Sequence, residues 1–131
     1  MTIEDGQIYY INFKGSIGTE INSIHLGIIY RLPILPDLLL CIPLTSPKLK
    51  HFKTESDFNK RNYLEMKHFS WQYLKQTDSI ALIDQIKTIS VNRLLAPFEN
   101  QDKEIIKLDE HTQKILKMKI IKYINIVLYK N

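Results

Sequence analysis

Two apolar runs separated by a short proline-containing segment constrain the fold of this chain more than any other feature. The runs are residues 25–31 (HLGIIYR) and 38–45 (LLLCIPLT), and Pro33 and Pro36 lie between them. Proline donates no backbone hydrogen bond, so it ends one strand and precedes the next. Pro43 inside the second run indicates an edge, a bulge or a strand end. This pattern predicts an antiparallel hairpin.

Further strands and one helix are expected on either side of this hairpin. Residues 8–13 alternate β-branched and aromatic side chains, which is typical of a strand, and 15–23 form a polar connection. Strand-like composition resumes at 70–74 and 79–89, while 108–129 carries apolar residues at helical spacing. The predicted fold class is α+β, a curled antiparallel β-sheet or barrel followed by a C-terminal amphipathic helix.

Length and composition favour one domain over residues 1–131, since the chain is 44% hydrophobic and too short for two ordinary cores. The sequence contains neither a secretory signal pattern nor an apolar run long enough for a bilayer, so we expect a cytoplasmic protein. The lone Cys41 lies in an apolar run, where a buried thiol is expected. The four scattered histidines favour neither a zinc site nor any other metal site.

Positive charge is concentrated in two zones. The net charge is +4 and the pI about 9.1. Residues 48–67 hold six Lys or Arg against three acids, and 111–131 hold five Lys and no acid. Such zones suit a phosphate backbone. The stretch 46–68 lacks a sustained period, which predicts a long loop, either a substrate-facing flap or a solvated insertion.

Three segments carry a family resemblance. They are 18–29 (GTEINSIHLGII), 42–46 (IPLTS) and 79–89 (SIALIDQIKTI), preceded by the strand pattern at 6–13. In order and spacing they resemble the MazF/PemK toxins. The resemblance implies an SH3-like barrel, usually a homodimer, that cleaves single-stranded RNA without a metal or other cofactor and leaves a 2′,3′-cyclic phosphate and a 5′-hydroxyl. It also implies a cognate antitoxin whose disordered tail covers the RNA groove.

The resemblance also points to catalytic residues. Metal-free cleavage needs a base for the 2′-hydroxyl, a cation for the phosphate and an acid for the leaving oxygen. Thr45 matches the family's catalytic threonine, Ser46 adds a second hydroxyl, and Glu20 matches the G-x-E acid. His25 replaces the catalytic arginine, and it can transfer protons near neutral pH. Alternatively, Thr45 only bonds the backbone, His25 is structural and Glu20 is a solvated loop carboxylate.

Histidine lacks the permanent bidentate charge of arginine, so Lys48 or Lys87 is expected to supply a cation. The RNA-binding candidates are Lys48, Lys50, Tyr63, Gln85 and Lys87. Residues 43–48 (PLTSPK) also look like a segment of the ToxN/AbiQ toxins, which are restrained by RNA, so the inhibitor is a protein or an RNA. The rival hypothesis is a non-catalytic barrel that binds nucleic acid or a protein such as DNA gyrase.

Overall fold

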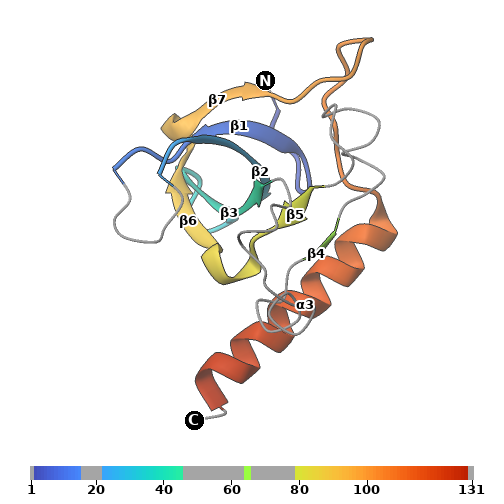
Figure 1. Cartoon of the computed structure of the whole chain (residues 1–131). Coiled ribbons are helices and arrows are strands. Elements are labelled where there is room, and N and C mark those ends of the chain that lie inside the picture. The colour runs from blue at the N-terminus through green and yellow to red at the C-terminus, as the bar shows by residue number, and fades with distance from the viewer. Residues whose placement is uncertain (1, 16–21, 46–63, 66–78, 130–131) are drawn as a thin grey trace. The chain divides into compact units, whose positions relative to one another are not determined.

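The computed structural model describes residues 2–15, 22–45, 64–65 and 79–129. The chain divides into two compact units, which we call the first unit (residues 1–44 and 85–108) and the second unit (residues 45–84 and 109–131). The elements are β1 Ile8–Asn12, β2 Ile24–Arg31, β3 Leu38–Thr45, β4 Leu64–Glu65, β5 Ile80–Ala81, η2 Ile83–Gln85, β6 Lys87–Ser90, η3 Val91–Arg93, β7 Leu94–Pro97 and α3 Glu110–Tyr129 (Figure 1).

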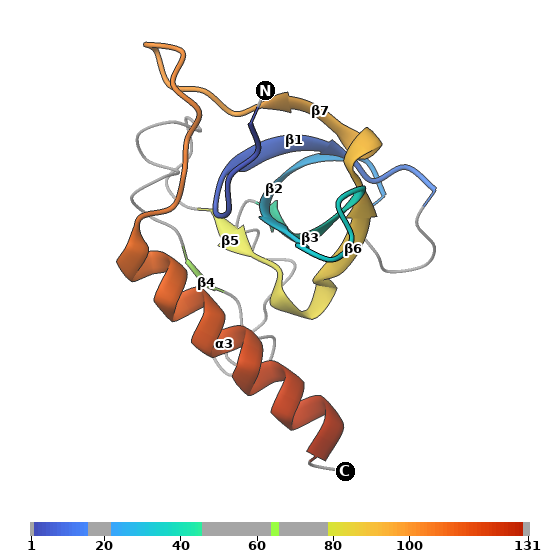
Figure 2. The ribbon, with the colours of Figure 1, turned by 180° about the vertical axis from the view of Figure 1, so that it is seen from behind.

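The first unit is built on an antiparallel sheet in the order β7, β1, β2, β3, β6. The strands curl around a common interior (Figures 1 and 2). β6 and β7 stand at opposite ends of this order, yet η3 joins them directly in the chain. Among the described residues no ladder joins them. The predicted curled antiparallel sheet is therefore confirmed, and it is a curled sheet rather than a closed barrel.

The predicted hairpin is confirmed, because β2 and β3 pair from Gly27 with Pro43 to Arg31 with Leu39. Two backbone bonds of 2.9 and 3.0 Å, each spanning three residues, shape the turn between the strands. The ladder between β3 and β6 reaches only from Leu38 to Cys41. Pro43 therefore lies beyond that ladder, where its missing N–H leaves no gap in the pairing with β6.

The expected strand over residues 79–89 is wrong as a single element. It divides into β5, the 3₁₀ turn η2 and β6. Asp84 lies in the turn, and aspartate is depleted in strands but common in turns, so this local preference prevails over the apolar residues around it. As a result the D-Q pair lies on a turn that precedes β6, and only the K-T-I part of the motif lies on a strand.

β7 is a strand that the sequence analysis does not identify. It pairs with β1 through Tyr9 with Pro97, Tyr10 with Ala96 and Ile11 with Leu94, and the register shifts between Tyr10 and Ile11. Its four residues are short for a strand and include a terminal proline, which is why the alternation is hard to recognise.

The second unit contains the C-terminal helix and a two-residue strand pair. α3 spans Glu110–Tyr129, close to the predicted range, and the Asp109 carboxylate accepts a 2.7 Å bond from the Thr112 amide as an N-cap. β4 pairs with β5, so the expectation of a loop over 46–68 is wrong at residues 64–65, and the rest of that stretch lies outside the described residues. The expected strand at 70–74 lies outside the described residues.

The core of the first unit is a cluster of aromatic and aliphatic side chains from β1, β2, β3 and β6. Cys41 lies in it and is fully buried, as expected, and burial raises the pKa of its thiol above the usual range. The cluster members are Tyr9, Ile11, Phe13, Ile29, Leu39, Cys41 and Ile89. These strands alternate inward and outward side chains, so the interior fixes where their polar ends lie.

Burial also makes the first unit sensitive to alkali. Burial, with a smaller contribution from the Asp5 charge, raises the pKa of Tyr30 from 10 to about 12. Because the pKa of Tyr30 is higher in the folded than in the unfolded state, the stability that the protonated hydroxyl contributes is full below pH 10 and is lost as the pH rises toward 12. We expect the free energy of unfolding, measured in urea, to fall by about 2 kcal/mol from this residue between pH 9 and 12. Tyr30→Phe should remove that part of the fall, and the exposed Tyr10→Phe should leave it.

Candidate active site

The end of the first unit at which β1 ends and β2 begins carries His25, and we call this end the sheet mouth. Ile11 pairs with His25 and Asn12 with Ile24, and the Phe13 amide donates to the Ser23 carbonyl at 3.0 Å. His25 is half-buried there. Paired residues project to the same face, so His25 shares the face of the fully buried Ile11. The imidazole thus lies at the border between core and solvent.

Lys87 reaches the sheet mouth from the opposite end of the curled sheet. It begins β6 and pairs with Cys41 of β3. Its Nζ lies 5.3 Å from the centroid of the Phe13 ring, which is a cation–π contact with the end of β1. Its charge lowers the Cys41 pKa, but burial has the larger, opposite effect. Phe13 bonds Ser23, two residues before His25, so Lys87 contacts the residue at which the β1–β2 connection begins.

The connection between β1 and β2 is held at its base by polar contacts. The Lys14 and Gly15 amides donate to the side-chain oxygens of Asn12 and Asn22, each at 2.9 Å. Arg93 closes the same base, because its Nη1 donates to the carbonyls of Asn12 at 2.9 Å and Lys14 at 3.0 Å. Arg93 belongs to none of the motifs identified in the sequence. In the sequence it stands out only as a cation between the strand predicted at 79–89 and the apolar pair Leu94 and Leu95.

Two further candidates lie in described elements. Thr45 is the last residue of β3 and is half-buried. The last described β2–β3 pair toward this end is Gly27 with Pro43, and His25 and Thr45 each lie two residues beyond it along their strands. Gln85 ends η2, just before β6, and is half-buried. The remaining candidates lie outside the described residues: Glu20, Ser46, Lys48, Lys50 and Tyr63.

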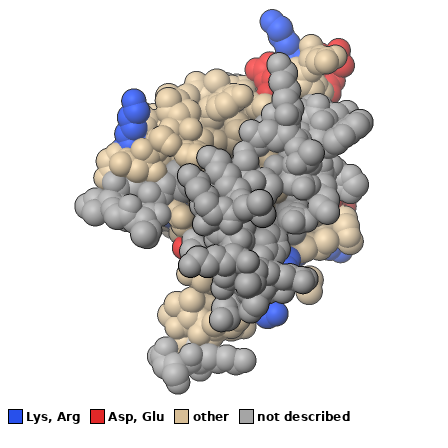
Figure 3. All heavy atoms as spheres, viewed as in Figure 1, with Lys and Arg blue, Asp and Glu red and all other residues tan. Residues whose placement is uncertain are grey.

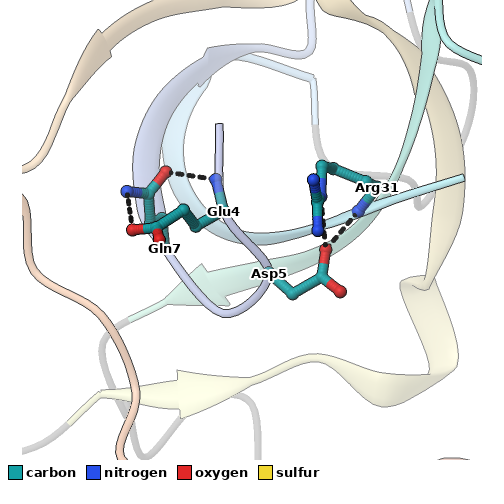
Figure 4. Close-up of polar contacts among 4 residues, drawn as sticks. All are labelled: Glu4, Asp5, Gln7 and Arg31. Atoms are coloured by element: carbon teal, nitrogen blue, oxygen red, sulfur yellow. Dashed lines mark hydrogen bonds and ion pairs between the residues drawn. The ribbon is translucent and has the colours of Figure 1, made fainter. Parts of the chain in front are cut away.

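The opposite end of β2 has a different character. The Arg31 backbone amide donates to Asp5 Oδ1 at 2.8 Å, and the Arg31 Nε lies 3.4 Å from the same oxygen (Figure 4). A neighbouring turn is bridged by Gln7, whose side chain bonds the Glu4 amide and carboxylate. A cavity of about 420 Å³ lies beside Arg31, lined mainly by Leu, Ile, Val and Pro. The guanidinium of Arg31 is thus neutralised by a carboxylate.

Acidic side chains gather on another part of the first unit. Figure 3 shows red atoms over the segment that follows β7, where Glu99, Asp102 and Glu104 lie around a turn. The Asn100 side chain shapes this turn by accepting from the amides of Asp102 at 2.9 Å and Glu104 at 3.0 Å. The same segment carries Lys103 and Lys107, so its three carboxylates exceed its cations by one, and the sheet mouth is the better electrostatic match for a phosphate backbone in this unit.

Among the residues that the structure describes, no group of three His, Cys, Asp or Glu side chains is arranged to hold a metal ion. The described portion of the chain likewise includes no helix with the length and hydrophobicity needed to cross a bilayer.

Comparison with known proteins identifies the class and then the family. The fold is that of a solved MazF toxin: the crystal structure of MazF (Form-I) from Deinococcus radiodurans matches with a TM-score of 0.66 over 95% of this chain and 98% of that chain, at 12% identity. No curated protein sequence matches the chain. The model of the PemK-like, MazF-like toxins of type II toxin–antitoxin systems matches residues 4–124. The chain therefore belongs to this toxin family.

Proposed function

We propose that this toxin is a metal-independent endoribonuclease that cleaves single-stranded RNA at selected sequences. The observation that carries the proposal is the contact of Lys87 with Phe13, the residue that follows β1, because His25 pairs with Ile11 at that same end of β1. Family membership supports the same reaction class. Attack of the 2′-hydroxyl on the adjacent phosphorus releases the 5′-oxygen, so the products carry a 2′,3′-cyclic phosphate and a 5′-hydroxyl.

The proposed roles follow from the chemistry of each group. His25 removes the proton of the 2′-hydroxyl or protonates the leaving oxygen, because imidazole titrates near neutral pH. Lys87 stabilises the charge that builds on the phosphate, and the Thr45 hydroxyl donates a hydrogen bond to a phosphoryl oxygen. We assign supporting roles to Glu20 and Ser46 at the site, and RNA contacts to Lys48, Lys50, Tyr63 and Gln85.

The partners follow from the family. We propose that a cognate antitoxin, a protein in keeping with the type II description, blocks the RNA-binding surface, and that the toxin acts as a cytoplasmic homodimer. Size-exclusion chromatography with light scattering measures the dimer, and co-expression with the neighbouring reading frame tests the antitoxin.

The decisive experiment is cleavage of a long single-stranded RNA in EDTA, with mapping of both ends of every product. The proposal requires discrete cuts whose 5′ fragments end in cyclic phosphate and whose 3′ fragments begin with a hydroxyl. RNA that is shifted on a gel but stays intact would instead support the non-catalytic binding module, which the missing arginine at position 25 favours. Cutting that EDTA abolishes and Mg²⁺ restores would overturn the metal-independent mechanism.

A further inference from the structure

We propose that Arg93 is a phosphate-binding residue at the sheet mouth, which grips an RNA phosphate next to the scissile one. The proposal rests on the proposed nuclease function and adds a binding residue that the sequence motifs do not assign.

Arg93 is held by only one edge of its guanidinium. Both Nη1 hydrogens are engaged, because Nη1 donates to the carbonyls of Asn12 and Lys14 at 2.9 and 3.0 Å. Within the described part of the chain, no acceptor is found for Nε or Nη2. These two nitrogens form the edge that binds two phosphate oxygens at once. Since the carbonyls already fix the planar group, little side-chain freedom remains to be lost when a phosphate binds.

The strand pairing places the backbone of the residue after Arg93 two strands away from His25. Ile11 pairs with His25 on one side and with Leu94, the residue after Arg93, on the other. Neighbouring strands lie about 4.8 Å apart, so the backbones of His25 and Leu94 are separated by about 10 Å. That separation suits contact with a neighbouring phosphate rather than the one being cleaved. Arg93 is therefore a binding residue and not a catalytic one.

The charges around the mouth favour an anion at this point. Lys87 contacts the Phe13 ring, and its ammonium has no fork geometry. His25 carries a full charge only below its pKa. The other guanidinium of this unit, Arg31, lies at the far end of β2 and is paired with Asp5. Arg93 thus supplies the permanent bidentate cation that position 25 lacks.

The test measures binding of a single-stranded RNA with 2′-O-methyl groups throughout, which has no 2′-hydroxyl to attack. Fluorescence anisotropy at several salt concentrations compares the parent with Arg93→Gln. Each lost phosphate contact lowers the slope of log K against log salt by about 0.7 for single strands. We expect about tenfold weaker binding of Arg93→Gln and a slope reduced by about that amount. Arg31→Gln is the matched control, with the same charge change at the other end of β2 and parent-like binding.

Two further measurements separate a phosphate contact from a purely structural clamp. With cleavable RNA, Arg93→Gln should raise KM about tenfold and leave kcat within about twofold. A contact with a neighbouring phosphate stabilises the bound substrate and the transition state equally, so its loss weakens binding without slowing the chemical step. Arg93→Lys keeps the charge but not the fork, so it should bind more weakly with an unchanged salt slope. If Arg93→Gln fails to fold, the binding measurement on Arg93→Lys still tests the proposal. Parent-like affinity of Arg93→Lys, or an unchanged slope in a folded Arg93→Gln, would overturn the proposal.

The outcomes also separate this inference from the proposed function. If the parent cuts RNA and Arg93→Gln binds it with the parent's affinity and salt slope, Arg93 has no phosphate-binding role and the nuclease proposal stands. If the parent leaves RNA intact while Arg93→Gln shows the expected loss of binding, the nuclease proposal fails and Arg93 belongs to a passive RNA-binding surface.

Discussion

RNA cleavage by a His25→Ala variant is expected to be about 10² to 10⁴-fold slower than cleavage by the parent. This is the usual contribution of a positioned general acid or base. His25 is half-buried at the sheet mouth, where it pairs with Ile11. The rate constant should be measured under single-turnover conditions across pH 5 to 9, because product release is then excluded. The parent rate should change through the titration range of a histidine, and the residual rate of the variant should not.

The control for His25→Ala is His111→Ala. His111 is exposed on the first turn of α3, where an alanine is compatible with the helix. Its loss should leave the cleavage rate and its pH profile unchanged. A His25→Ala protein that cuts as fast as the parent would remove histidine from the mechanism and leave Lys87 and Thr45 as the groups to test.

Gly27→Val should lower the free energy of unfolding by about 3 kcal/mol, the upper part of the range for overpacked cores. Gly27 lies in the middle of β2, between Tyr9 of β1 and Pro43 of β3. A Cβ at this position would lie 2.6 Å from the Ile11 Cδ1 and 2.8 Å from the Cys41 Sγ, and both side chains are fully buried. Neither can move aside without displacing the core. Urea unfolding monitored by fluorescence measures the loss.

A compensating substitution tests the cause of that loss. Ile11→Val removes the Cδ1 that clashes and by itself costs about 1 kcal/mol. In a Gly27→Ala background it should cost less, since it also relieves the contact. Gly15→Ala is the control: its φ is +96° and no atom lies within 4 Å of the added Cβ, so only backbone strain of about 1 kcal/mol is expected. Additive costs for Ile11→Val and Gly27→Ala would contradict the clash.

Sequence reasoning recovered the elements whose patterns are local. β1, β2, β3 and α3 follow from alternation, from the proline-separated hairpin and from helical spacing, and the buried Cys41 follows from its apolar neighbours. It missed β7, because that strand depends on pairing with a distant strand rather than on the pattern of its own residues. β7 is a strand because β1 offers it a partner, and this long-range contact leaves little trace in four residues.

The candidate site was predictable only in part, because local motifs are visible in the sequence and long-range contacts are not. His25 and Lys87 came from motifs, but the contact of Lys87 with Phe13 depends on the curl of the sheet, which the sequence alone does not place. Arg93 was missed because its importance is a geometric one: two carbonyl acceptors from β1 and the residues after it hold its guanidinium. No spacing rule along the chain links Arg93 to Asn12 and Lys14.

The pairing of β7 with β1 has a consequence for synthesis on the ribosome. β1 emerges before β7, and the edge of β1 that pairs with β7 stays without its partner until Pro97 has left the exit tunnel. Such a long-range contact forms late, because a large loop must close before it is made. Arg93 reaches Asn12 by the same closure. The sheet mouth therefore takes its final form only after β7 has been synthesised and has paired with β1.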